Sequence, residues 1–399
     1  MKTPAALLGA VDRFNYGDLL FPLVVRAAWD RLGVGRPLTV YAMRESDLSA
    51  FGALPSRSYR QLLADVRAGE VSGLVLAGGE MLGARWHTMA IYLGSPLQGA
   101  LLKAARRVLG ADAVDRLVGR SYGAAGAWPW VISPAELPRP VPIVYNAVGG
   151  VTALERAAPA VLFSVVERLK AARYVAVRDE RTRALLAGAG LPSVRLVPDS
   201  AVLIGELFPL DELAARVRPE LRRLVDEGPY FALQANVNVG VDIAPALGRQ
   251  LERVEAELNV RPFLLPIGRA AGHEDQVALG RVAAATRARA AFAPVDASVI
   301  EIMYVIARSA AYVGTSLHGA ITALAFDRPH LALSKRVPKL LAHLETWSLA
   351  ELSGGIEPDD LARAVGEALA VHPARLRERR EAAVRLAWEH ILAMTEALA

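Results

Sequence analysis

The sequence predicts an α/β protein of two halves, each a parallel sheet wound with helices, with a cleft between them. Strand–turn–helix units recur through the first 200 residues, beginning with the apolar run 5–11, and strands and helices follow in the second half as well; this order is typical of parallel sheets. Hydrophobic residues make up 53% of the 399 residues but aromatic residues only 6%, which favours buried strands and helices rich in Ala, Leu and Val. A charged helical stretch, 205–228, separates the halves.

The composition excludes several classes of site. The chain contains no cysteine, so disulfides, thiolate metal sites and cysteine nucleophiles are ruled out. The net charge of +5 is compatible with anionic small-molecule substrates and is too diffuse to indicate nucleic acid. The apolar run 5–11 is too short for a secretion signal, and no run of about 18 uncharged apolar residues predicts a membrane span. We therefore expect a cytoplasmic enzyme.

The expected elements divide the chain into four parts. An N-terminal α/β domain is expected at 1–205, a connecting segment at 206–228, a C-terminal α/β domain at 229–372 and a C-terminal helix at 373–399. Apolar runs predict strands at 5–11, 38–43, 73–77, 142–146, 174–177, 194–197, 230–235, 261–267, 310–313 and 330–333. Helical spacing predicts helices at 19–32, 61–68, 180–187, 244–258, 297–307, 317–326, 358–370 and 373–398.

Three further helical predictions concern single features. Thr152 and Glu155 have the spacing of a capping box, which predicts a helix that begins directly after a strand. The segment 101–117 is expected to form one basic helix, which is either a solvated face or a patch that rests on anionic lipid or a lipid-linked substrate. The C-terminal helix, 373–398, is interpreted as a solvated amphipathic helix. The basic residues of the segment 101–117 are Lys103, Arg106, Arg107 and Arg116.

The stretch 312–331 is the centre of the predicted site. A buried strand runs into Gly314, Thr315 and Ser316, which form a turn with helix-capping residues, and His318 follows in the first turn of a helix. Such a turn lies at the carboxyl end of a strand, where an open α/β sheet places its ligands. Free N–H groups and the helix dipole suit an anion. His318 is therefore a candidate for proton transfer, and a structural role is the alternative.

Other candidates lie on loops that follow strands. Arg178 ends a strand, where its guanidinium is expected either to grip a phosphate or carboxylate or to pair with a neighbouring acid, Asp179, Glu180 or Asp199. Polar side chains on two earlier loops are expected to bind sugar hydroxyls or to cap helices; they are Asn15, Asp18 and Glu80. Gly78 and Gly79 let the backbone approach a ligand closely, but the dinucleotide fingerprint GxGxxG does not occur there.

The remaining histidines carry less weight. His273 with Glu274 and Asp275 is interpreted as either a loop in the cleft or a polar turn, and His330 as the start of a buried strand. No HExxH or comparable spacing of ligands predicts a metal site.

In this order, the loop segments resemble the motifs of the polysaccharide pyruvyl transferase family. The segments run from near the start of the chain to about residue 331, and the two most specific contain Arg178 and His318. They are Asn15-Tyr16-Gly17-Asp18, Gly78-Gly79-Glu80, Val177-Arg178-Asp179-Glu180, Val197-Pro198-Asp199 and Gly314-Thr315-Ser316-Leu317-His318-Gly319.

The resemblance implies a glycosyltransferase-B-like fold. Two Rossmann-like domains with parallel sheets would face an interdomain cleft, with helices at the C-terminus and no nicotinamide cofactor. The domain at 1–205 would bind the acceptor and contribute Arg178, and the domain at 229–372 would bind the donor.

The resemblance also implies a reaction, the transfer of a pyruvyl group from phosphoenolpyruvate to two hydroxyls of one sugar. The products would be a cyclic ketal and phosphate, with phosphoenolpyruvate as co-substrate and no further cofactor. The acceptor would be a glycan or a lipid-linked saccharide, and peripheral membrane association would fit such an acceptor. The family's donor-binding Arg corresponds to Arg178, and its motif His to His318. Many members have Arg two residues before that His, where this chain has Ser316, so one potential phosphate ligand is missing.

The chemistry expected from the residues agrees with this donor. Phosphoenolpyruvate carries two or three negative charges, which Arg178 and the turn of Thr315, Ser316, Leu317 and His318 are expected to hold. His318 is the predicted general acid/base. The expected acceptor or cleft residues are Asn15, Gly17, Asp18, Gly78, Gly79 and Glu80.

Two other functions are compatible with the same sequence features. A glycosyltransferase that uses a nucleotide sugar would also place a helix N-terminus and a basic residue against a diphosphate. A non-catalytic glycan-binding protein would retain the fold, and Ser316 favours it, whereas Arg178 and His318 favour catalysis.

Overall fold

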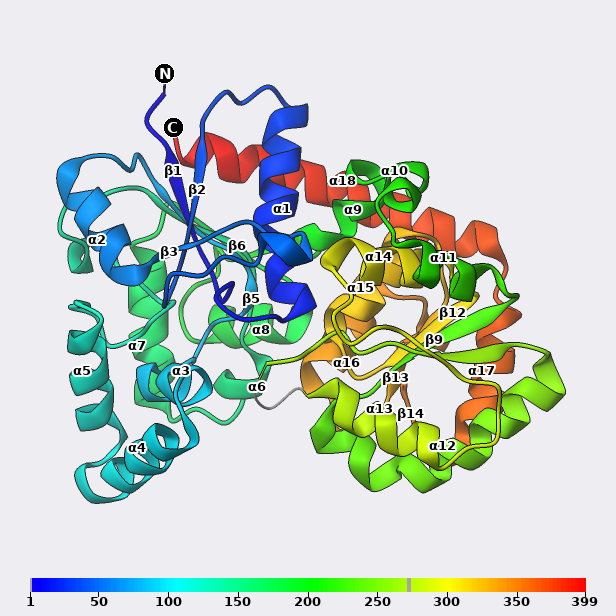
Figure 1. Cartoon of the computed structure of the whole chain (residues 1–399). Helices are drawn as coiled ribbons and strands as arrows, with labels where there is room; N and C mark the ends of the chain where they lie inside the picture. Colours follow the sequence, from blue (N-terminus) through cyan, green and yellow to red (C-terminus); the bar gives the residue numbers. More distant parts are fainter. Residues whose placement is uncertain (1, 271–273) are drawn as a thin grey trace.

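The protein contains two parallel β-sheets, one in each half of the chain (Figure 1), which confirms the predicted fold class. The computed structural model describes residues 2–270 and 274–399. The first sheet has the strand order β3-β2-β1-β4-β6-β7-β8, with β5 paired to β6, and the second has the order β11-β10-β9-β12-β13-β14. Neighbouring strands within each sheet run parallel.

Ten of the strands lie at the predicted runs, and four short ones, β3, β5, β11 and β14, were not predicted. Those of the first sheet are β1 (Ala5–Leu8), β2 (Leu38–Ala42), β3 (Arg57–Ser58), β4 (Leu74–Leu76), β5 (Gly79–Glu80), β6 (Ile143–Gly149), β7 (Tyr174–Val177) and β8 (Arg195–Leu196). Those of the second are β9 (Tyr230–Gln234), β10 (Arg261–Leu264), β11 (Ala291–Phe292), β12 (Ala311–Gly314), β13 (His330–Leu333) and β14 (Gly355–Ile356).

Helices connect the strands in both halves. In the first half they are α1 (Tyr16–Arg31), α2 (Tyr59–Ala68), α3 (Trp86–Leu93), α4 (Pro96–Leu109), α5 (Ala111–Ser121), α6 (Val151–Leu154), α7 (Pro159–Lys170) and α8 (Glu180–Gly188). Short helices follow, α9 (Ile204–Leu207), α10 (Leu210–Ala215) and α11 (Pro219–Asp226). The rest are α12 (Val237–Leu258), α13 (Asp275–Ala284), α14 (Val299–Arg308), α15 (Leu317–Ala325), α16 (Pro338–Trp347), α17 (Leu361–Leu369) and α18 (Pro373–Ala397).

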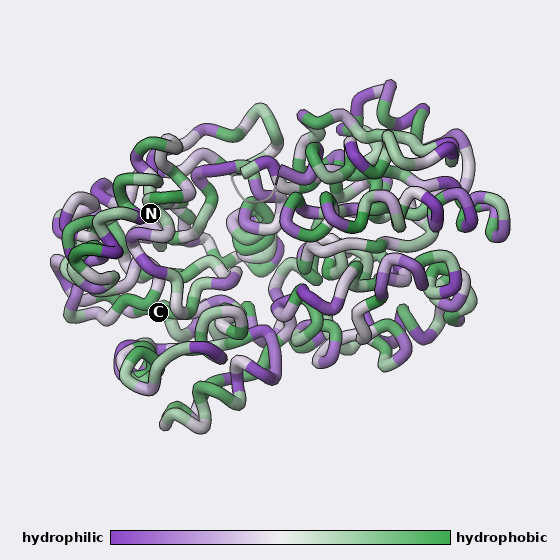
Figure 2. The backbone as a smooth tube through the Cα atoms, turned by 90° about the horizontal axis from the view of Figure 1, so that it is seen from below, coloured by the Kyte–Doolittle hydropathy of each residue, from purple (hydrophilic) through white to green (hydrophobic). Residues whose placement is uncertain are grey.

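Each sheet reverses its strand order at one point. In the first sheet this switch point lies between β1 and β4, and in the second between β9 and β12. Loops that leave the carboxyl ends of two such strands diverge to opposite sides of the sheet, which opens a crevice where ligands bind in α/β proteins. The topology therefore singles out the loops after β1, β4, β9 and β12. Figure 2 shows the two halves side by side, with hydrophobic and hydrophilic segments alternating in each.

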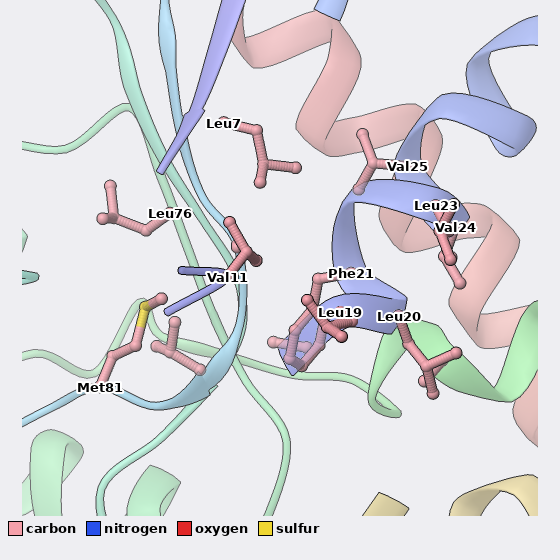
Figure 3. Packing of buried hydrophobic residues seen from close by; sticks show 14 of the residues in the cluster. Leu7, Val11, Leu19, Leu20, Phe21, Leu23, Val24, Val25, Leu76 and Met81 are labelled. Carbon is pink, nitrogen blue, oxygen red and sulfur yellow. The ribbon is translucent and has the colours of Figure 1, made fainter. Parts of the chain in front are cut away.

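Helix α1 packs on the first sheet and lies close to the second half as well. Its side chains lie on the same side of the sheet as Leu7 of β1, whereas Leu76 of β4 points to the other side (Figure 3); all of them belong to one continuous hydrophobic core. It also contacts α14 and α15 of the second half. A helix covered on several sides is apolar on several faces, and this accounts for the uninterrupted apolar stretch from Leu19 to Val25, all of which is buried.

The loop after β1 joins the two halves directly. Asn15 forms an antiparallel bridge with Gly268, and the Tyr16 N–H donates to the Ile267 carbonyl at 3.1 Å. The guanidinium of Arg269 lies 3.7 Å from the centre of the Phe14 ring, a cation–π contact. Backbone pairing and this stacked contact fix one edge of the cleft between the halves.

The C-terminal helix is not the solvated helix that the sequence analysis expected. Helix α18 runs from the second half back across the first (Figure 1), where Ile391 and Met394 are fully buried. His390 is also buried, and its ring accepts or donates hydrogen bonds at Tyr174 and Asn146, both at 2.8 Å. The many charged residues in the first half of α18 made the helix look solvated in the sequence, so its buried face was not predicted.

Two other local predictions were wrong. The segment 101–117 is not one helix, because Gly110 adopts a φ of 80° between α4 and α5. The capping box at Thr152 and Glu155 does not form; Gly150 is the N-cap of α6, without a side-chain cap. Instead the Thr152 N–H donates to the Glu80 side chain at 2.8 Å. The first turn of α6 is therefore capped by a residue of β5 and not by a residue of its own helix.

The buried face of α18 gives a prediction for stability. Met394→Ala removes a fully buried side chain and should lower the free energy of unfolding by about 2–5 kcal/mol. Leu392→Ala, on the same helix but 46% exposed, should change it by no more than about 0.5 kcal/mol. Urea denaturation of both variants measures the difference. Equal effects would mean that α18 does not pack on the core as described.

Candidate active site

A cavity of about 320 Å³ lies where the carboxyl ends of the two sheets meet. It is open to the loops after β1, β4, β9 and β12, the positions that the switch points single out. The lining residues come from both halves, and they are Ala10, Arg13, Asn15, Asp18, Gly78, Gly79, Glu80, Met81, Met89, Tyr92, Trp130, Arg178, Gln234, Asn236, Asn238, Ile267, Gly268, Ala270, Asp275, Thr315, Ser316, Leu317, His318 and Lys339.

The structure brings the residues predicted from the sequence together in this cavity. Every predicted site residue except Gly17 lines it. Gly17 lies directly behind His318, because a Cβ atom on Gly17 would come within 2.0 Å of His318 Nδ1. Phe21, one turn further along α1, meets the His318 ring edge to face at 5.2 Å between centroids. The ring of His318 is thus held against the first half although it belongs to the second.

Asp199 connects the two most specific predicted residues. Its Oδ2 atom lies 3.3 Å from Nη1 of Arg178 and 3.6 Å from Nε2 of His318. Asp199 and Arg178 are buried, and His318 is 8% exposed. Burial raises the pKa of the Asp199 carboxyl, but His318 and Arg178 more than offset this and hold that pKa well below its usual range. Asp199 is therefore a buried anion that faces Arg178 of the first half and His318 of the second half.

Arg178 is held by two carboxylates rather than left free. Besides Asp199, it donates through Nη2 to Glu80 Oε2 at 3.0 Å. Burial lowers the pKa of Arg178, yet Glu80 and Asp199 outweigh burial and raise it. The alternative of an ion pair with Asp199 is thus present in the structure, while Arg178 still lines the cavity. Gly149 makes room for this pair, since a Cβ there would lie 2.6 Å from Glu80 Oε2.

The turn before α15 has the expected helix cap. Ser316 accepts the Gly319 N–H through its hydroxyl at 3.4 Å. The N–H and hydroxyl of Thr315 are used within the protein, because both donate to the Gln234 side-chain oxygen, at 2.9 and 3.1 Å. The first N–H groups of a helix have no partner within it, so those of Leu317 and His318 remain for an anion at the cavity wall.

Lys339 is a site residue that the sequence analysis missed. It lies in the first turn of α16 and lines the cavity, and it has no ion pair or hydrogen bond within the described part of the chain. Burial lowers the pKa of its ammonium group, Arg178 lowers it further, and Glu80 and Asp18 act in the opposite direction. Arg13, by contrast, is paired with Asp12 at 3.2 Å. Lys339 is therefore the cation best placed to receive an anionic ligand.

His343 lies one helical turn beyond Lys339 on α16. It is buried, and burial lowers the pKa of its imidazole to about 3, so the ring is neutral at physiological pH. Its Nδ1 atom has no hydrogen-bond partner among the described residues. Trp347 on the same helix donates from Nε1 to the Arg178 carbonyl at 2.7 Å, so α16 is anchored to the strand end that delivers Arg178.

A second buried carboxyl, that of Asp275, also lines the cavity and shares Gln234 with Thr315 of the turn before α15. Its Oδ2 atom accepts three hydrogen bonds, from the N–H groups of Ile267 and Gly268 and from Gln234 Nε2, at 2.9–3.0 Å. Oδ1 is buried without a partner, and burial raises the pKa of this carboxyl to about 7. His273, which the sequence analysis grouped with Glu274 and Asp275, lies outside the described residues.

The side of the cavity formed by the first half combines polar and apolar groups. Asn15 donates to Asp18 Oδ2 at 2.7 Å, so these two side chains form one polar pair rather than two helix caps. Tyr92 and Met89 of α3 and the buried Trp130 add an apolar surface. Polar side chains next to an aromatic or apolar surface suit a small number of oriented hydrogen bonds and an apolar face, as in many ligand pockets.

Within residues 2–270 and 274–399, no group of three or more His, Asp or Glu side chains could hold a metal ion.

Two Rossmann-type sheets with a cavity between their carboxyl ends define the class of protein, the GT-B fold. Similar solved structures are the UDP-GlcNAc 2-epimerase from Methanocaldococcus jannaschii (TM-score 0.52, 12% identity, 94% of each chain covered) and MnaA of S. aureus in a co-structure with UDP (0.55, 13%, 98% of this chain and 95% of that chain). Another is the UDP-GlcNAc 2-epimerase from Neisseria meningitidis bound to UDP-GlcNAc (0.54, 10%, 99% of each chain). At these identities the likeness shows the fold alone.

A family model matches part of the sequence. Residues 150–335 match the model of the family described as polysaccharide pyruvyl transferase, which confirms the resemblance that the loop motifs indicated. The matched range includes Arg178, Asp199 and His318. No protein of curated function matches the sequence significantly.

The raised pKa of Asp275 gives a prediction about stability and pH. A carboxyl whose pKa is about 7 when folded, against an ordinary value of 3.8, binds its proton more tightly in the folded state. Its contribution to stability is therefore present at pH 4 and is lost as the pH rises to 7, by at most about 4 kcal/mol. Asp275→Asn cannot ionise, so its stability relative to wild type should be higher at pH 8 than at pH 5.

Urea unfolding at the two pH values measures this difference, with Asp211→Asn, at an exposed position of α10, as the control. A difference between Asp275→Asn and wild type that is the same at both pH values would contradict the assignment.

Proposed function

We propose that the protein transfers a pyruvyl group from phosphoenolpyruvate to two hydroxyls of a sugar in a polysaccharide or glycan precursor. The products would be a cyclic ketal and inorganic phosphate. The main support for this proposal is the position of His318 and Arg178. They come from different halves of the chain, and both lie next to the buried carboxylate of Asp199. Both residues lie in the part of the chain that matches the pyruvyl transferase family.

The donor would bind on the side of the cavity formed by the second half. Its phosphate needs positive charge and N–H donors, and Lys339 with the first turn of α15 supplies both. The guanidinium of Arg178 lines the cavity but is already bonded to Glu80 and Asp199. Arg178 would therefore contribute positive charge near the phosphate without bonding it directly. Lys339 would thus replace the arginine that many family members have at the position of Ser316.

The chemistry requires two proton transfers and no redox step. One sugar hydroxyl attacks C2 of phosphoenolpyruvate while C3 gains a proton and becomes a methyl group. The second hydroxyl then attacks C2 and displaces phosphate, and the two hydroxyl protons balance those gained by C3 and by the leaving phosphate. His318 would act as the general acid/base, since a protonated imidazole can both protonate C3 and stabilise the departing phosphate. Asp199, 3.6 Å from Nε2 of the ring, would place a negative charge beside it.

The acceptor would bind on the side of the first half. The pair of Asn15 and Asp18 can hydrogen-bond sugar hydroxyls, and Tyr92 with Met89 offers an apolar surface to a sugar ring or to a lipid-linked saccharide. Gly78 and Gly79 leave the backbone accessible there. We infer that the reaction needs no cofactor besides phosphoenolpyruvate and takes place in the cytoplasm, at the inner face of the membrane.

The test is to incubate the protein with phosphoenolpyruvate and a panel of pyranosides. The expected result is a product whose mass exceeds that of the sugar by pyruvate less water, with phosphate released in equal amount. His318→Ala should lower kcat by about 100-fold to 10,000-fold. Release of UDP or GDP from a nucleotide sugar by the same protein would support a glycosyltransferase instead, and binding of glycans without any product would support a non-catalytic protein.

The role of Lys339 gives a sharper prediction. Lys339→Ala removes the unpaired cation from the cavity and should raise KM for phosphoenolpyruvate by about 10-fold to 100-fold, the range expected for a hydrogen bond to a charged group. Lys339→Arg should retain most of the affinity. Lys335→Ala is the matched control, because Lys335 precedes the same helix but is exposed. A Lys339→Ala enzyme with the same KM as Lys335→Ala would contradict the assignment.

A further inference from the structure

Helices α3, α4 and α5 form an excursion of the first half that exposes large apolar side chains. The excursion separates β5 from β6 and lies at the end of the molecule away from the second half (Figure 1). Its exposed large apolar residues are Tyr92, Leu97, Leu101, Val108, Leu109 and Leu117. Monomeric proteins rarely leave contiguous apolar surface exposed unless it binds something.

The apolar residues of α4 form a stripe along its outer face. Leu97, Leu101 and Val108 follow one another at spacings of four and seven residues, which places them on one side of a helix, and they are 71%, 62% and 82% exposed. Ala104 lies between them on the same stripe and is also exposed. No part of the described chain covers this stripe.

The two helices of this surface also carry positive charge. The basic residues of α4 and α5 form no ion pair within the described part of the chain. These residues are Lys103, Arg106, Arg107, Arg116 and Arg120. Helix α4 contains no acidic residue. The acidic residues of α5, Asp112 and Asp115, both pair with Arg85, so they do not neutralise the basic groups.

This surface continues into the mouth of the cavity. Helix α3 packs against both α4 and α5, and its residues Met89 and Tyr92 line the cavity. Tyr92 is 45% exposed, so it belongs to the cavity wall and to the outer apolar surface at once. A ligand bound at the stripe would therefore lie beside the entrance that leads to Asp18 and Glu80.

We propose that the outer face of α4 and α5 binds the surface of an anionic lipid bilayer. A helix with an apolar stripe flanked by lysine and arginine lies in the membrane interface, with the stripe among the acyl chains and the cations against the headgroups. In residues 2–270 and 274–399, no helix is long and apolar enough to cross a membrane, and an interfacial contact requires none. A second copy of the chain suits this face less well, because it would bring unpaired cations against like charges.

Together with the proposed function, this contact identifies the class of acceptor as a saccharide carried on a membrane lipid. The lipid would remain in the bilayer under α4, and the sugar would reach the cavity past Tyr92. The membrane contact itself does not depend on catalysis.

The experiment is sedimentation of the full chain with vesicles of phosphatidylcholine, with and without phosphatidylglycerol. Wild type should bind only when phosphatidylglycerol is present. The triple variant Lys103→Ser, Arg106→Ser, Arg107→Ser should lower the partition coefficient by about 100-fold, since each basic side chain near such a surface contributes roughly fivefold. The double variant Leu101→Ser, Val108→Ser should lower it by at least about tenfold.

Phe163→Ser, which removes a side chain that is 62% exposed on α7, is the control and should bind as wild type. All the substituted residues are exposed, so circular dichroism and melting temperature should not change. The proposal is overturned if wild type does not bind the anionic vesicles, if the variants bind as wild type does, or if wild type forms a dimer that the double variant dissociates. His318→Ala should bind vesicles normally, so loss of pyruvyl transfer and loss of membrane binding are distinguishable.

Discussion

The contact of Asp199 with Arg178 and His318 is the constraint on which the site depends. Asp199 is fully buried, and a buried carboxylate is costly unless opposite charges accompany it. Arg178 supplies an opposite charge from the first sheet, and the imidazole of His318, from the second half, lies 3.6 Å from the same carboxylate. A single buried carboxylate is therefore shared by groups from the two halves.

Small residues and backbone contacts make this arrangement possible. Gly17 leaves the space that the His318 ring occupies, and Gly149 leaves the space for Glu80 beside Arg178. Tyr16, next to Gly17, hydrogen-bonds through its hydroxyl to Thr322 at 2.8 Å, and Thr322 in turn donates to the His318 carbonyl at 2.7 Å. The first turn of α1 is thus fitted against the first turn of α15. The position of a proton-transfer group is set by contacts between the halves, as precise positioning requires.

Much of the fold was predictable because it depends on local patterns. Apolar runs and turn residues predicted the longer strands to within a few residues, but not the two-residue strands β3, β5, β11 and β14. The loop motifs contain most of the predicted groups that line the cavity. Lys339 was missed because it follows β13 by several residues and reaches the cavity only through the packing of α16. The burial of α18 was missed for a similar reason, since its partners, such as Asn146, lie in the other half. Asp199 belongs to one of the loop motifs, but its role depends on its contact with His318, which lies 119 positions further along the sequence.

The most direct test of the account is a crystal structure of the protein soaked with phosphoenolpyruvate in the absence of acceptor. The account predicts electron density for the phosphate within hydrogen-bonding distance of Lys339 Nζ and of the first N–H groups of α15, with the enol carbon facing His318. Phosphate density elsewhere in the cavity, or an empty cavity under conditions in which a uridine nucleotide binds, would contradict it.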